Sequence, residues 1–279
     1  MADESTLALI DSAAGFIAGA VVTIVFQPFD SILTQNQYHR RSAGAAVNAL
    51  LAKGGGPALW RGTLPALALV PLQNALLMTG YGFGARFGGS RADDEPERAA
   101  PRKALAPVFF GGCAGGLAQS FVASPFELAK VRRQLFASAP GASAATRGLA
   151  ATFYRDVVPH GVWFVAYDVA RAALDDPDDP GAAAPPLAGG AFAAALAWLV
   201  GYPFDLLKTR IQGSPTPVSL ADATRAVLRD AGPGPSGAVL ALYRGFALKL
   251  LRAVPSNSLN FYVYEAARRR LAAAAAHLY

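Results

Sequence analysis

The sequence predicts an all-α membrane protein with six membrane-spanning helices in three repeated units, and three observations carry this prediction. First, 53% of the 279 residues are hydrophobic and only 16% are charged, whereas charged residues make up about 25% of a soluble domain. Second, each long apolar segment is interrupted by proline, glycine or a charged residue, as in helices that line a water-filled cavity. Third, a Pro-Phe-acid triplet occurs three times with similar surroundings.

The first helix of each unit is the apolar segment that leads into the triplet. The triplets begin at Pro28, Pro125 and Pro203, which are 97 and 78 residues apart. Upstream of each triplet lie glycines that let helix backbones approach closely in a bilayer. They are Gly15 and Gly19, Gly112 and Gly116, and Gly189 and Gly190. We therefore expect each first helix to pack closely against a neighbour.

A polar connection follows each triplet, and we expect it to contain a short helix. An aromatic-arginine turn then precedes the second long helix: LWRG at residues 59–62, FYRD at 153–156 and LYRG at 242–245. The second helices contain Pro71, Pro159 and Pro255. Each unit is thus a long helix, a connection with a short helix, and a second long helix.

Two segments rich in proline, glycine and charge, residues 88–103 and 174–186, are predicted to be exposed linkers between the units. The repeats therefore span residues 1–98, 99–180 and 181–279. Because one unit cannot bury its polar face alone, we expect residues 1–279 to form a single domain.

Several functions are excluded by what the sequence lacks. A single cysteine, Cys113, excludes an intrachain disulfide framework and a cysteine-rich metal site. There is no phosphate-binding loop, dinucleotide motif or nucleophile elbow, so neither an enzyme nor a cofactor or metal site is expected. The net charge of +6 suits anionic lipid or an anionic substrate. Binding of nucleic acid is not expected, because the sequence has no soluble basic module. The acidic N-terminus has neither the arginine-rich composition of a transit peptide nor the basic start of a signal peptide, so any targeting signal is expected to be internal.

The repeated triplet resembles the mitochondrial carrier family, whose signature is Pro-x-acid-x-x-base-x-base three times per chain. The resemblance covers essentially the whole sequence. It implies a six-helix barrel with threefold pseudosymmetry, short matrix-side helices and a central substrate site. It also implies alternating access, mostly as an exchanger in the mitochondrial inner membrane, with peroxisomal and plastid membranes as alternatives. A monomer in contact with membrane lipid is expected, with cardiolipin among the candidate lipids.

The resemblance implies a matrix gate built from the three triplets. A proline kinks its helix and turns the helix end toward the axis, where charges are least unfavourable when they are paired. By position, Asp30 would pair with Lys130, and Glu127 with Lys208. Three glutamines match the family's braces beneath these pairs: Gln37, Gln134 and Gln212.

The first repeat departs from the family pattern. Leu33 and Gln35 occupy the two positions where bases are expected, so Asp205 is expected to lack a partner. This predicts a weaker matrix gate with two ion pairs instead of three. The second bases of the other repeats, Arg132 and Arg210, are expected to face the rim or anionic headgroups.

A cytoplasmic gate is implied at the other end of the second helices. The residues that match its aromatic-acid-x-x-base motif are Tyr167, Asp168, Arg171, Tyr264, Glu265 and Arg268. In the first repeat the corresponding stretch, GYGFGAR at 80–86, has glycines where the acid should be. Asp168 is expected to pair with Arg268, while Glu265 would need Arg86, one residue out of register.

The candidate substrate-binding residues are Arg155, Asp156 and Arg252, at the level where the family binds its substrates. The same level of the second helix is apolar, at Ala68 and Leu69. A neighbouring base and acid suit a zwitterion, because the base binds a carboxylate and the acid an ammonium. Such pairs resemble the carnitine/acylcarnitine and basic amino acid carriers, as does YRDVVPHGVWFVAYD at 154–168.

Three alternatives stay open. Arg155 and Asp156 could simply neutralise each other or face the helix end, the solute could be a carboxylate or a nucleotide, or the chain could be a scaffold that no longer transports. Lesser candidates are each weighed against an ordinary packing role. They are His160 for proton coupling, Trp163 for a cation–π contact, and Gln73, Asn74, Asn257 and Asn260 as cavity-lining amides.

Overall fold

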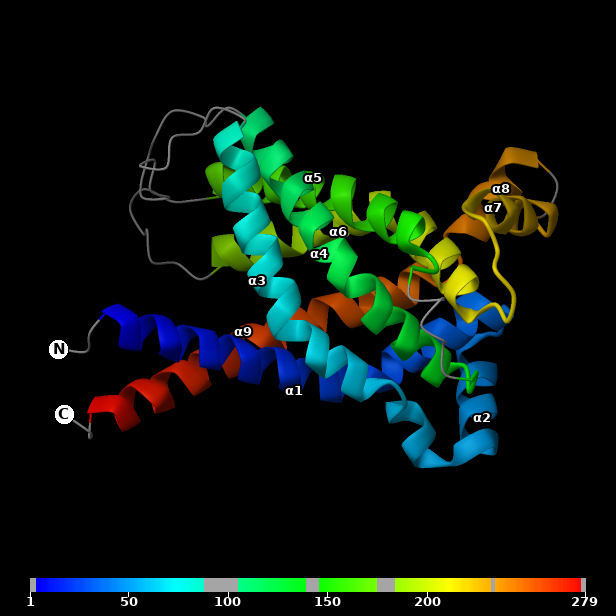
Figure 1. Ribbon diagram of the computed structural model, residues 1–279, viewed down its shortest axis with the longest axis horizontal. Helices are drawn as coiled ribbons and strands as arrows, with labels where there is room; N and C mark the ends of the chain where they lie inside the picture. Colours follow the sequence, from blue (N-terminus) through cyan, green and yellow to red (C-terminus); the bar gives the residue numbers. More distant parts are fainter. Residues whose placement is uncertain (1–3, 88–104, 139–145, 175–183, 232–233, 277–279) are drawn as a thin grey trace.

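The computed structural model describes residues 4–87, 105–138, 146–174, 184–231 and 234–276, and all regular structure in these ranges is helical (Figure 1). Among them are the two long helices expected of each unit. They are α1 (Glu4–His39), α3 (Thr63–Phe87), α4 (Leu105–Gln134), α5 (Leu149–Leu174), α6 (Ala184–Gly213) and α9 (Phe246–Ala276). The short helices are α2 (Ala43–Gly54), the 3₁₀ helix η1 (Gly56–Trp60), α7 (Leu220–Arg229) and α8 (Gly234–Leu242).

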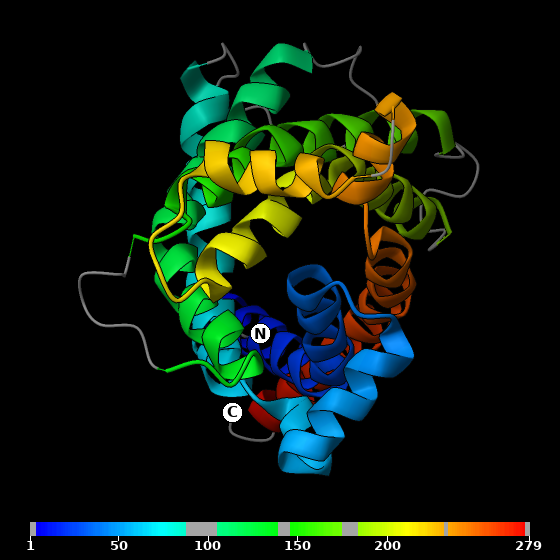
Figure 2. The same ribbon diagram turned by 90° about the vertical axis from the view of Figure 1, so that its right-hand side faces the viewer.

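The long helices contact one another in a closed cyclic order: α1, α3, α4, α5, α6, α9 and again α1. Figure 2 shows this ring from the end that carries the short helices. The two chain termini lie at the opposite end, where the start of α1 and the end of α9 are neighbours (Figure 1). The C-terminal halves of α1, α4 and α6 therefore meet at the end where α2, α7 and α8 lie.

Four described segments are long and apolar enough to cross a membrane by length and composition. They are Leu9–His39, Gly56–Tyr81, Leu105–Gln134 and Ala188–Gly213. The helices α5 and α9 exceed the roughly 20 residues that a span needs, with 26 and 31 residues. Their sequences are more polar, because each carries charged residues along its length. Six spans remain the expectation from the repeat.

The triplet prolines lie inside long helices and do not end them. Helix α1 continues from Pro28 to His39, and Pro125 and Pro203 lie within α4 and α6 in the same way. The acid and the glutamine follow each proline by two and nine residues, and the position five residues after it holds a base on α4 and α6 but Leu33 on α1. Helical positions three or four residues apart share a face, so these groups form one stripe on each of the three helices.

The turns before α3, α5 and α9 are Arg-Gly turns at residues 61–62, 147–148 and 244–245. Their glycines have φ angles of +86°, +83° and +87°, in a region where a side chain would be strained. The expected turn FYRD instead lies inside α5, so this part of the sequence prediction was wrong. The connection in the second unit is shorter, and its turn motif carries no aromatic residue before the arginine.

The Arg-Gly turns put the three second helices in register. Seven residues after each turn glycine come Leu69, Arg155 and Arg252. This agrees with the level assigned to the candidate substrate contacts. Four residues after each turn glycine come Ala66, Thr152 and Lys249, so only the last unit has a base at this lower level.

Helix α4 packs between α3 and α5 through two pairs of glycines. Gly111 and Gly115 face α3, while Gly112 and Gly116 lie against the backbone of α5. By contrast, the expected close packing at Gly15 is absent, because no atom lies within 4 Å of where its Cβ would be. The same holds for Gly190, and Gly189 makes only ordinary contacts with α5. Gly19 is tightly packed, since a Cβ there would lie 2.5 Å from Cγ1 of Val70 on α3, so the glycines before the triplets pack differently from one unit to the next.

Gly112→Ala is expected to destabilise the protein by about 1–3 kcal/mol through overpacking. A Cβ at this position would lie 2.6 Å from the backbone oxygen of His160, which cannot move without shifting α5. Gly15→Ala is the matched control and is expected to be neutral or slightly stabilising, since alanine is the better helix former. Thermal unfolding of the purified variants in detergent measures both. Equal unfolding temperatures for the two variants would contradict this packing.

Candidate functional site

Charged side chains from five of the long helices gather where α1, α4 and α6 meet. We call them the central ion-pair network. Its members within the described residues are Asp30 on α1, Glu127 and Lys130 on α4, Arg155 and Asp156 on α5, Asp205 and Lys208 on α6, and Lys249 and Arg252 on α9. The network holds five basic and four acidic groups, so it carries one positive charge in excess.

The structure brings together both pairs that were expected between the triplets. The Nζ atom of Lys130 lies 2.6 Å from Oδ2 of Asp30 and joins α4 to α1. The Nζ atom of Lys208 donates to Oε2 of Glu127 and joins α6 to α4. Lys208 is almost fully buried, and a buried base of this kind needs its acid, because an unpaired charge would be poorly solvated.

Asp205 has partners, and the prediction that it lacks one was wrong. Its carboxylate lies 3.4 Å from Nζ of Lys249 and 3.6 Å from a guanidinium nitrogen of Arg155. Gln37 also donates to Oδ2 of Asp205, at 3.2 Å. Leu33, where a base was expected, is buried with 5% of its surface exposed. The missing base of α1 is replaced by bases on the second helices α5 and α9.

Arg155 is the centre of the network. Its guanidinium makes two hydrogen bonds to the carboxylate of Asp156, at 2.6 and 2.7 Å. A third hydrogen bond, of 2.7 Å, reaches Oε1 of Glu127. Asp156 is buried and also accepts a long hydrogen bond from Ser120 of α4. The alternative in which Arg155 and Asp156 neutralise each other therefore describes the arrangement in this structure.

Arg252 belongs to the same network and enters it from α9, between α6 and α1 in the ring. Its Nε lies 2.9 Å from Oδ1 of Asp30, whose other oxygen binds Lys130. The side chains of Arg252 and Asp30 keep 23% and 14% of their surfaces exposed. They are more accessible than Arg155 and Asp156, which have 8% and 5%.

The three bracing glutamines each reach the first helix of another unit. Gln37 binds Asp205 and also accepts a hydrogen bond from Thr209 of α6, at 2.7 Å. Gln134 accepts from Thr34 of α1 at 2.8 Å. Gln212 donates a long hydrogen bond to the carbonyl oxygen of Ser124 on α4, at 3.5 Å. The glutamines thus connect all three interfaces between α1, α4 and α6, two of which also carry an expected ion pair, and Gln37 touches the network directly.

The side chains at the second base position of each triplet signature connect the ends of neighbouring first helices. Gln35, Arg132 and Arg210 each donate to a backbone carbonyl of another unit: that of Gln134 at 3.0 Å, Ser214 at 3.2 Å and Gln37 at 3.1 Å. Arg132 is buried. The expectation that the second bases face the rim or headgroups was therefore wrong for Arg132, because carbonyls left unpaired at a helix end attract it.

At the opposite end of the ring, Arg268 binds a residue that the sequence analysis did not single out. Its Nε donates to Asp11 of α1 at 2.6 Å, and the hydroxyl of Tyr264 lies 3.2 Å from the same carboxylate oxygen. The expected partner of Arg268 was Asp168, which lies with Arg171 on α5. The side chains of Glu265, Arg86, Asn74 and Asn257 lie outside the described residues.

Two lesser candidates have packing partners. Nδ1 of His160 donates to the backbone oxygen of Asp156 at 2.6 Å, and its Nε2 accepts from Gln119 at 3.0 Å. This supports the packing interpretation of His160. Trp163 stacks on Tyr167, with ring centres 5.4 Å apart. Gln73 and Asn260 lie on α3 and α9 and make no contact with the network among the described residues.

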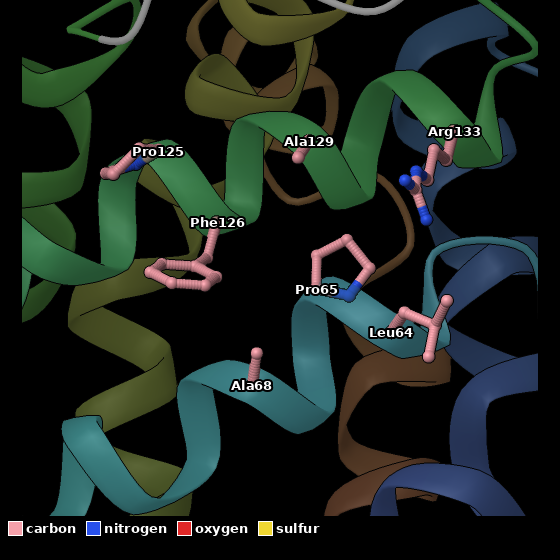
Figure 3. A pocket seen from close by; sticks show the side chains of 7 residues that line it. All are labelled: Leu64, Pro65, Ala68, Pro125, Phe126, Ala129 and Arg133. Carbon is pink, nitrogen blue, oxygen red and sulfur yellow. The ribbon is translucent and has the colours of Figure 1, made fainter.

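A cavity of about 420 Å³ opens between α3 and α4, away from the ion-pair network (Figure 3). Its lining is apolar except for Arg133 and includes Ala68, Pro125 and Phe126. Figure 3 shows Ala68 and Phe126 pointing toward each other across it. A lining without an acid offers no partner for a cationic group, so the network remains the candidate site.

Sequence reasoning missed Lys249 and Asp11. Lys249 precedes Arg252 by three residues and so lies on the same face of α9. That spacing from Arg252 could have identified Lys249, but the family signature predicts bases only on the first helices. Asp11 lies in the first turns of α1, far from any motif, and nothing in the sequence marks it as a partner of α9.

The chain matches the family model described as "Mitochondrial carrier protein" at residues 5–90 and 181–274. It is 30% identical to the mitochondrial arginine transporter of Arabidopsis thaliana, over 92% of this chain and 90% of the relative. It is 29% identical to the mitochondrial carnitine/acylcarnitine carrier-like protein of the same plant, over 94% of this chain and 98% of the relative. It is also 29% identical to the mitochondrial electrogenic aspartate/glutamate antiporter of Mus musculus, over 91% of this chain but 40% of that longer protein.

Proposed function

Because the chain belongs to the mitochondrial carrier family, we propose that it exchanges a small amino acid or carnitine-like solute across a membrane by alternating access. Its relatives in the family are transporters and not enzymes. The solute that we propose carries both a carboxylate and a cationic nitrogen. Arginine, aspartate, glutamate and carnitine, which the names of the relatives specify, all have these two groups.

One observation supports the choice of solute: Arg155 and Arg252 each have an acid beside them, Asp156 and Asp30. Both charged groups of a zwitterion would therefore find a partner of opposite charge there. A carboxylate of the solute would bind Arg252, which is exposed enough to be reached. Its ammonium group would bind Asp30, next to Arg252, or Asp156 once Arg155 turns toward the solute. Charge-assisted hydrogen bonds of this kind are about twice as strong as neutral ones.

We propose that the same contacts drive the conformational change. The ion pairs between α1, α4 and α6 hold the matrix side closed, and Asp30 and Glu127 belong to both the pairs and the solute site. A bound zwitterion offers these groups new partners and so offsets the pairs that must break. A ligand shifts a conformational equilibrium only by its difference in affinity for the two states. Because the same acids bind either the gate lysines or the solute, the solute binds more tightly once the gate pairs have broken. The pair of Arg268 with Asp11 lies at the cytoplasmic end of the ring and would break when that end closes.

Uptake into proteoliposomes tests the proposal. Purified protein is reconstituted with internal carnitine, lysine, arginine, ornithine, ATP, phosphate or malate, and each labelled solute is tested in exchange. We expect uptake of carnitine or amino acids above protein-free liposomes and none of the other three. If Asp156 holds the ammonium group, Asp156→Asn abolishes this uptake, because the amide cannot pair with an ammonium group; uptake that survives in this variant would assign the ammonium group to Asp30. Uptake of ATP, phosphate or malate that Asp156→Asn leaves intact would reject the zwitterion site.

A second candidate is a carrier of a carboxylate or nucleotide anion. The one positive charge in excess in the network favours it, and the same uptake experiment separates the two. The scaffold alternative loses its motivation, because Asp205 has bases beside it despite the leucine at position 33. If no solute in a broad metabolite panel raised the unfolding temperature, the scaffold role would be favoured.

We propose the mitochondrial inner membrane as the location, because the relatives are named as mitochondrial proteins. Four described segments are long and apolar enough to span a bilayer. Peroxisomal and plastid membranes are the alternatives. We further propose a monomer whose outer faces contact membrane lipid, cardiolipin included.

A further inference from the structure

Lys249 of α9 is a buried base that no triplet and no gate motif accounts for. Its Nζ lies 3.4 Å from Oδ2 of Asp205 and 3.8 Å from the centre of the Trp198 ring. The residues at the same level of the other two units are Ala66 and Thr152. Only the unit that contains Asp205 therefore carries a base here, and Asp205 is the triplet acid whose usual partner is absent.

The ion pair of Lys249 with Asp205 is longer than the ion pairs of the other lysines in the network. Lys130 approaches its acid to 2.6 Å, within the range of a strong charge-assisted hydrogen bond, whereas Lys249 stays at 3.4 Å. The face of Trp198 holds the same ammonium group by a cation–π contact. Since Asp205 also accepts from Gln37 and lies near Arg155, Lys249 can leave it without exposing an unpartnered acid.

Lys249 also lies beside the proposed carboxylate contact. It precedes Arg252 by three residues, so the two bases lie one turn apart on one face of α9. The network has one base more than it has acids, so one cation can bind a new carboxylate without leaving an acid uncompensated. A lysine ammonium on its flexible stem can rotate between two carboxylates, which a rigid guanidinium fork does less easily.

We propose that Lys249 determines specificity for the carboxylate of the solute and, without solute, neutralises Asp205 in place of the missing base of α1. This inference rests on the proposed function. The carboxylate binds Arg252 and Lys249 together and draws Lys249 from Asp205. Because the contact between Lys249 and Asp205 joins α9 to α6, the link between these two helices loosens at the moment the solute binds.

Three variants separate the two roles. Lys249→Met removes the charge and keeps a long side chain. The double variant Lys249→Met with Leu33→Lys restores a base on α1, one turn before Gln37, which already reaches Asp205. Lys249→Arg keeps the charge. The readouts are the unfolding temperature of the solute-free protein and the KM for exchange, with Lys53→Met on the outlying helix α2 as the matched control.

We expect Lys249→Met to lower the unfolding temperature by about 4 °C, as for a loss of one to two kcal/mol in a chain of this size, and to raise KM about tenfold. Leu33→Lys should restore the unfolding temperature of the double variant but not its KM. Lys249→Arg should keep KM within about threefold of the original protein, since the charge is retained. Lys53→Met should change neither readout.

Two results would overturn the inference. If Leu33→Lys restored both readouts, Lys249 would only neutralise Asp205 and would not contact the solute. If Lys249→Met changed neither readout, Lys249 would have no role in either state. A failure of the proposed function looks different: the unmodified protein itself would then exchange no carboxylate-bearing solute, while the unfolding temperatures would still report on the contact with Asp205.

Discussion

Arg155→Met is expected to abolish exchange and to destabilise the protein by about 3–5 kcal/mol, as when one partner of a buried ion pair is removed. Arg155 is 8% exposed and binds the carboxylates of Asp156 and Glu127, with Asp205 within 3.6 Å. Without the guanidinium, Asp156 keeps only the long hydrogen bond from Ser120 among the side chains bonded to it here. Unfolding temperature and proteoliposome uptake measure the two effects.

A double variant distinguishes the structural role of Arg155 from its role in transport. Arg155→Met with Asp156→Asn removes both charges, so no acid is left alone beside the buried methionine. We expect most of the stability to return, because replacing both members of a buried pair costs far less than removing one. Exchange should stay absent. Return of exchange in the double variant would contradict a role for this pair at the solute site.

Arg225→Met is the control for the loss of an arginine from an ion pair. Arg225 binds Asp222 on α7, where both side chains are largely exposed. Surface ion pairs contribute about 0–1 kcal/mol, so this variant should unfold and transport like the original protein. A large effect there would show that the assay responds to charge loss in general.

Glu127→Gln is expected to have the second largest effect: loss of exchange and destabilisation by about 3 kcal/mol, the lower end for a broken buried pair. Glu127 joins the expected gate to the candidate solute site, because one oxygen accepts from Lys208 and the other from Arg155. The neutral amide leaves Lys208, which is 3% exposed, without its partner from α4. The free energy of unfolding and the rate of exchange are the measurements.

Adding Lys208→Met to Glu127→Gln tests the cause of that loss. If an unpaired buried lysine is responsible, the double variant should be more stable than Glu127→Gln alone. Asp222→Asn on the surface of α7 is the matched control for neutralising an acid and should have little effect. A double variant less stable than either single change would mean that Lys208 has another acid as its main partner.

The sequence by itself determined the helical membrane fold, the order of the elements and two of the ion pairs. Three triplets within apolar segments place an acid and a glutamine on one stripe of each first helix, with a base between them on α4 and α6, because helical periodicity depends on local spacing alone. The resemblance to the carrier family implied the pairs of Asp30 with Lys130 and of Glu127 with Lys208, and the structure brings both pairs together. The register of Arg155 with Arg252 also follows from counting residues.

Only the tertiary structure decided which charged groups meet outside the triplet pattern. Asp205 takes Lys249 from a second helix because α9 lies against α6 in the closed ring, a proximity that no local spacing records. Arg268 likewise binds Asp11, although 257 residues separate them. Equal glycine motifs pack tightly on α4 and not around Gly15, because the approach of two helices depends on the surfaces of both. Local pattern thus sets the elements, while the partners of buried charges follow from desolvation: each charge binds whichever opposite charge the assembled helices bring near.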